Sequence, residues 1–117
     1  MTLRECYAQL NGDFEGTLGR LCSTKLVERF ALKFLADDSY AMLEEAITMG
    51  NYNDAFRAAH TLKGVCINLG FTQLYNASDE LTEALRDGAK PEDETLFEKV
   101  KNEYHRTIGL LQELQNG

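Results

Sequence analysis

The residues best suited to chemistry in this sequence are His60, Lys63 and Gly64, which lie close together in the stretch 53–70. Residues three and four positions apart share one face of an α-helix, so the three form a single surface patch if the stretch is helical. A neutral imidazole, whose ordinary pKa is about 6.5, is a usable nucleophile at pH 7. The Lys63 ammonium has donors that can meet the oxygens of a phosphoryl group arriving on that ring. The patch therefore combines a nucleophile with a counter-charge for an anion.

Gly64 is unusual because a glycine inside a helix costs about 0.8–1.0 kcal/mol relative to alanine. It follows the histidine by one helical turn. Close packing between helices would be one reason for a glycine, but Gly64 lies away from the apolar stripe of the stretch. We interpret it instead as a gap in the side-chain cover that lets another macromolecule reach the imidazole.

The apolar residues of the stretch recur every three or four positions, which predicts a helix packed in a bundle. The predicted buried stripe consists of Ala55, Ala59, Leu62, Cys66 and Leu69. His60 belongs to the neighbouring row, with Phe56, Lys63 and Ile67, at the margin of that stripe. The imidazole should therefore be supported on one side and exposed to water on the other.

The run His60-Thr61-Leu62-Lys63-Gly64, followed by five residues and Gly70, resembles the signature of histidine-containing phosphotransfer (HPt) domains. In that family the histidine takes a phosphoryl group from an aspartate of a receiver domain and passes it to another receiver. The resemblance implies that His60 is the phosphoacceptor, that Lys63 stabilises the phosphoryl charge and that Gly64 leaves steric access. Val65 and Cys66 stand where the family usually has small residues such as Ser or Ala.

The function implied by the resemblance is that of a covalent phosphocarrier in a two-component phosphorelay, without independent catalytic activity. Its expected partners are response-regulator receiver domains and, in addition, a hybrid histidine kinase. No cofactor is expected, and any magnesium would belong to the receiver. The apolar side chains of Phe56 and Ile67 flank His60 and are the expected partner-binding residues, with an ordinary core edge as the alternative interpretation.

The helix after Gly70 should fold back along the His60 helix and bring polar side chains near the imidazole. A residue about ten positions before the turn faces one about ten positions after it. The candidates for contact with the imidazole or the phosphoryl group are Asp79, Thr82, Glu83 and Arg86.

Composition predicts one domain spanning residues 1–117, since this length can bury a modest core without disulfides. The three cysteines show no CxxC spacing, which favours reduced thiols and a cytoplasmic location. A net charge of −7 argues against nucleic-acid binding, and no apolar run is long enough to span a membrane. We expect a monomer.

Periodicity and capping residues predict an all-α fold, an antiparallel up-down-up-down four-helix bundle with short N-terminal helical segments. Expected helical ranges are 2–10, 23–36, 39–49, 53–70, 71–87 and from Pro91 onward, with 14–21 ambiguous because of its two glycines. Phe30 is expected on the buried side of its helix. The helices 23–36 and 39–49 should pack as an antiparallel pair because their connection is short.

Other functions fit the sequence less well. A di-metal carboxylate site needs Glu-x-x-His pairs, which neither His60 nor His105 provides, so no metal site is expected. No nucleophile motif supports Ser-His-Asp hydrolysis. The main alternative is a non-catalytic helical adaptor that binds a partner through the His60 face, and a third is a phosphotransfer domain fed directly by a kinase.

Overall fold

The computed structural model describes residues 1–117, and it is all-helical with no strand. Its elements are α1 (Leu3–Leu10), α2 (Phe14–Leu21), α3 (Thr24–Lys33), η1 (Phe34–Ala36), α4 (Ser39–Met49), α5 (Tyr52–Leu69), α6 (Thr72–Ala84), η2 (Arg86–Gly88) and α7 (Thr95–Asn116). The ambiguous stretch 14–21 is thus a helix. None of these helices is both long enough and apolar enough to cross a membrane.

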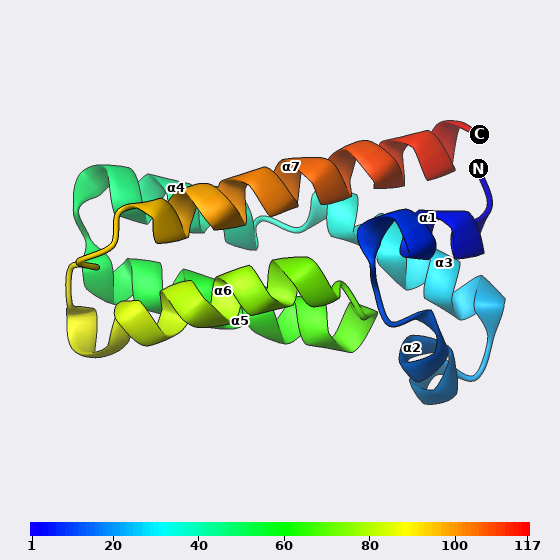
Figure 1. The fold of residues 1–117 in the computed structure, drawn as a ribbon, viewed down its shortest axis with the longest axis horizontal. Coiled ribbons are helices and arrows are strands. Elements are labelled where there is room, and N and C mark those ends of the chain that lie inside the picture. The colour runs from blue at the N-terminus through cyan, green and yellow to red at the C-terminus, as the bar shows by residue number, and fades with distance from the viewer.

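A helical bundle of α4, α5, α6 and α7 forms the main body of the molecule (Figure 1). Each of these helices packs against the next one along the chain. The first and last are joined by aromatic stacking, because the ring of Tyr40 on α4 lies 3.9 Å from that of Tyr104 on α7. One cluster of buried apolar side chains runs through the bundle, and six of its residues come from α5, namely Ala55, Ala58, Ala59, Leu62, Cys66 and Leu69.

The first three helices gather at one end of the bundle, beside the two chain termini (Figure 1). There α1 packs on α7, and α3 packs on α2, α5 and α7. The expected antiparallel pairing of helices 23–36 and 39–49 is wrong, because α3 does not pack along α4. After α3 the chain passes through η1, where Phe34 stacks edge-on against Phe71 and Tyr104, and so α4 starts beyond the end of α3.

Helix α5 has well-defined caps at both ends. At its start the Asn51 side chain accepts a hydrogen bond from the backbone N–H of Asp54. At its end Gly70 adopts a left-handed conformation, with φ of 72°, which glycine takes without steric cost. The predicted helix 53–70 is therefore confirmed within one residue at each end.

The carbonyl groups at the end of α5 receive hydrogen bonds from the N-terminal helices. The Tyr7 hydroxyl donates to the Leu69 carbonyl at 2.6 Å, and the Asp13 N–H donates to the Gly70 carbonyl at 2.9 Å. The Arg20 guanidinium donates to the carbonyls of residues 67 and 68 at 3.1 and 3.2 Å. The last carbonyls of a helix lack partners within it, so these contacts complete α5.

Two expected boundaries differ from the structure. The last helix begins at Thr95 rather than near Pro91, and the Asp93 carboxylate just before it accepts hydrogen bonds from the N–H and the hydroxyl of Thr95, at 2.9 and 2.6 Å. The helix expected to reach Asp87 ends at Ala84. The short 3-10 helix η2 follows it, and there Asp87 has a positive φ of 63°.

Candidate functional site

The buried face of α5 is the predicted stripe. Ala55, Ala59, Leu62, Cys66 and Leu69 are all buried. Burial raises the pKa of the Cys66 thiol, so this cysteine is a protonated core residue. The opposite face of the same helix is available for chemistry.

His60 lies in the middle of α5 with its side chain exposed to solvent. Its ring is 6.0 Å from the partly buried ring of Phe56, measured between centroids. The Arg86 guanidinium lies over the same Phe56 ring, 5.5 Å from its centroid. The imidazole therefore has one apolar support and remains open elsewhere, as the sequence predicted.

Lys63, one turn after His60, forms an ion pair with Asp79 on α6. The Lys63 Nζ donates to Asp79 Oδ1 at 2.9 Å. This hydrogen bond and the negative charge of the Asp79 carboxylate raise the pKa of Lys63, although partial desolvation acts in the opposite direction. The lysine is therefore a fixed positive charge at neutral pH, held between α5 and α6.

Gly64 faces open space. A Cβ atom built on it would meet no atom of another part of the protein within 4 Å. Close helix packing is thus not the reason for this glycine, in contrast to Gly12, whose Cβ would lie 2.6 Å from the Gly70 carbonyl oxygen. The surface beside the imidazole is bare at the position where any other residue would project a side chain.

The four candidates that follow the Gly70 turn occupy different places, three of them on α6 and Arg86 on η2. Asp79 is paired with Lys63, while Glu83 accepts two hydrogen bonds from Arg86, at 2.6 and 3.2 Å. These bonds lower the pKa of Glu83 and raise that of Arg86. Thr82 is buried, and its hydroxyl donates to the Ser78 carbonyl at 2.6 Å. The expectation that Thr82 faces the site is therefore wrong, because Thr82 lies one turn after the buried Ser78, on the side of α6 that faces the core.

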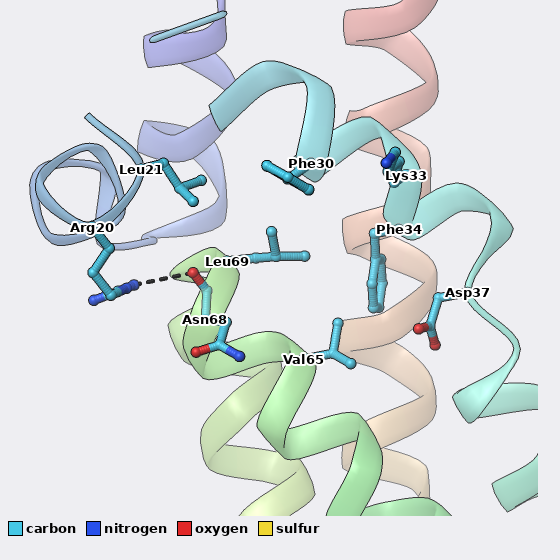
Figure 2. Close-up of a pocket in the computed structure, with 9 residues that line it drawn as sticks. All are labelled: Arg20, Leu21, Phe30, Lys33, Phe34, Asp37, Val65, Asn68 and Leu69. Carbon is cyan, nitrogen blue, oxygen red and sulfur yellow. Dashed lines mark hydrogen bonds between the residues drawn. The ribbon is translucent and has the colours of Figure 1, made fainter. Parts of the chain in front are cut away.

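Ile67 stands exposed on the histidine row, with 49% of its surface accessible. Beyond it, a groove of about 440 Å³ separates the end of α5 from α2 and α3. Figure 2 shows Val65 and Leu69 of α5 on one side of this groove and Phe30 of α3 on the other. Exposed apolar surface thus occurs at Ile67 on the histidine row and, separately, in the groove at the end of α5.

Phe30, like Thr82, differs from its predicted position, since it is 37% exposed rather than buried. It lies on α3, which packs with α2 and the end of α5 instead of with α4, so its side chain borders the groove. The sequence held a partial indication of this exposure, because the charged Lys33 follows Phe30 by three positions and so shares its face of the helix. In the structure the Lys33 Nζ lies 5.1 Å from the centroid of the Phe30 ring.

Taken together, α5 presents an exposed imidazole with a cation one turn away on one side and an uncovered glycine on the other. These groups can receive a small anionic group from a partner that approaches closely. No cluster of three or more His, Cys, Asp or Glu side chains is placed to hold a metal ion. His105, the second histidine, is exposed on α7 beside two tyrosine rings and has no comparable surroundings.

Comparison with known proteins gives one match. The family model described as the Hpt domain matches residues 34–116, which include α4 to α7 and the whole of the site. No curated protein and no solved structure matches the chain.

Proposed function

Because the chain belongs to the Hpt domain family, whose members are phosphotransfer modules of two-component signalling, we propose that it carries phosphoryl groups between receiver domains on His60. In this proposal a receiver aspartyl phosphate is the donor and an aspartate of a second receiver is the acceptor. The protein is a carrier intermediate and has no catalytic activity of its own.

The observation that carries the proposal is the combination of three groups on the exposed face of α5. His60 is accessible, Gly64 leaves its neighbourhood bare, and Lys63 is anchored as a cation one turn away. Phosphoryl transfer depends on positioning and charge stabilisation more than on covalent help from the protein. A site of three residues is therefore sufficient for a carrier.

The chemistry is an in-line displacement at phosphorus. The lone pair of the imidazole Nε2, the nitrogen that points away from the backbone, forms an N–P bond while the P–O bond to the receiver aspartate breaks. The carboxylate leaves with the electron pair, and the reverse sequence loads the second receiver. Lys63 contributes N–H donors to the phosphoryl oxygens as charge builds on them.

The receiver is proposed to dock on the apolar surface that surrounds His60. Phe56 and Ile67 flank the imidazole, and a separate groove bordered by Phe30 and Val65 lies between the end of α5 and α3. Apolar patches of this kind with polar surroundings are typical of transient protein contacts. Of the candidates after the Gly70 turn, Asp79 and Glu83 on α6 and Arg86 on η2 form the charged margin of the surface around His60.

The test is incubation with a phosphorylated receiver, followed by measurement of acid-labile, alkali-stable label. We expect His60→Gln to abolish the label completely. His105→Gln is the matched control, since it removes the only other histidine, also exposed, and should leave labelling unchanged. Label that persists on His60→Gln would remove His60 from the role.

The alternative of a non-catalytic adaptor is favoured by the same exposed Ile67 and groove, which would bind a partner without any phosphate. It predicts that a receiver binds wild type and His60→Gln equally and labels neither. Substitution of Ile67 by Asp should weaken binding under both proposals, so labelling is the measurement that separates them.

The scaffold of the proposal is an antiparallel up-down-up-down bundle of α4 to α7, supported by the packing of each helix on its successor. We propose a monomer in the cytoplasm, where three free thiols are stable. Light scattering after size exclusion at micromolar concentration tests the monomer directly.

A further inference from the structure

The cation that should serve the phosphoryl group already has a partner. Lys63 Nζ lies 2.9 Å from Asp79 Oδ1, and the two side chains are 20% and 41% exposed. Their hydrogen bond is the main cause of the raised pKa of Lys63. A half-sheltered pair of this kind is screened by salt less than a fully exposed one.

A phosphoryl group on His60 would bring a second anion to the same ammonium. Lysine has three N–H donors, but it is a point charge whose attraction is shared among all nearby anions. Asp79 therefore draws on the same positive charge that would stabilise the phosphoryl oxygens. Two anions, one permanent and one transient, therefore compete for Lys63.

We propose that Asp79 is a positioning residue that competes with the phosphoryl group for Lys63 and so keeps the phosphohistidine easy to discharge. This inference rests on the proposed function of His60. It assigns Asp79 to Lys63 rather than to the imidazole or the phosphoryl group. A carrier benefits from such competition because a group bound too firmly is not passed on.

The experiment compares wild type with Asp79→Asn after loading by a phosphorylated receiver. Two quantities are measured: the half-life of phosphohistidine once the receiver is removed, and the equilibrium ratio of labelled carrier to labelled receiver. We expect Asp79→Asn to increase both by about three- to tenfold, the size of one partly screened charge interaction. Asp79→Glu, which keeps the charge, should stay close to wild type.

Glu80→Gln is the matched control. It makes the same charge change on the next residue of α6, where Glu80 pairs with Lys99 of α7 at 3.6 Å instead of with the site. We expect no change in either quantity. An effect equal to that of Asp79→Asn would mean that overall charge is responsible, and the inference would be overturned.

The role of Lys63 is tested by repeating Asp79→Asn in a Lys63→Ala background. Most of the effect should disappear, because the ammonium for which the two anions compete is gone. An undiminished effect, an unchanged Asp79→Asn variant, or a shorter phosphohistidine half-life in that variant would each overturn the inference. If wild type itself takes no label, the proposed function fails first and the role of Asp79 fails with it.

Discussion

The middle of α5 and its C-terminal end differ sharply in how the rest of the protein covers them. At the end, Tyr7, Asp13 and Arg20 reach across from the first helices and donate to carbonyls of residues 67–70. In the middle, His60 has a single aromatic neighbour and Gly64 meets nothing.

The difference follows from helix geometry. Backbone groups in the middle of a helix are hydrogen-bonded within it, whereas the last carbonyls are not. A helix can therefore leave a middle turn bare at the small cost of a glycine, but its end needs partners. This is a physical reason for placing a reactive residue well inside a long helix, and it predicts that stability and phosphotransfer can be altered separately.

The largest difference between an effect on phosphotransfer and an effect on stability is expected at Gly64. Gly64→Leu should reduce phosphotransfer roughly 100-fold, because displacement of reacting groups by about an ångström has effects of that size. The free energy of unfolding should rise by up to about 1 kcal/mol, since leucine favours helix more than glycine does. Rapid-quench transfer kinetics and urea denaturation measure the two effects.

Gly109 provides the control for this experiment. It is exposed inside α7, and a Cβ there would also meet nothing within 4 Å. Gly109→Leu should give the same gain in stability with unchanged transfer. If Gly64→Leu transferred as fast as Gly109→Leu, the bare surface at Gly64 would have no functional meaning.

The second prediction concerns the end of the helix. Tyr7→Phe removes the buried donor to the Leu69 carbonyl and should lower the free energy of unfolding by about 1–3 kcal/mol. Phosphotransfer by the folded protein should be unchanged. Tyr52→Phe, a half-buried tyrosine at the start of the same helix, should cost much less. Equal losses would show that the Tyr7 hydroxyl does not complete the helix end.

The smallest effect is the pH dependence of the Lys63–Asp79 pair. The folded pKa of Lys63 lies above its ordinary value of 10.5, so the stabilisation is fully present below pH 10.5 and is lost as pH rises through the folded pKa. The stability difference between wild type and Lys63→Met, less than about 1 kcal/mol, should be constant from pH 7 to about 9.5 and shrink above pH 10.5. A difference that grows at high pH would contradict the pairing.

Local pattern was sufficient to predict much of this site from the sequence. The three- and four-residue spacing in α5 placed its buried stripe, its exposed histidine and its uncovered glycine correctly, because all of these depend on one helix alone. Matching positions at equal distances before and after the Gly70 turn also placed Asp79 near the site, although its partner is Lys63 and not the imidazole.

Contacts between distant segments could not be predicted in this way. Tyr7 and Leu69 are 62 positions apart, and no periodicity indicates that they meet. Phe30 was misplaced for the same reason, since its exposure depends on which helix α3 packs against. Thr82 was misplaced because the count from the Gly70 turn gives the level along α6 and not the face, and Thr82 shares the buried face of Ser78.

The hydrogen bonds from the first helices to the end of α5 also bear on how this unit can be transplanted. The family match begins at residue 34, in η1, which leaves out all three donors and the α3 wall of the groove. A chimaera that borrows only the matched segment would inherit the reactive turn on a helix whose final carbonyls have lost their donors. The natural graft boundary therefore lies before α1.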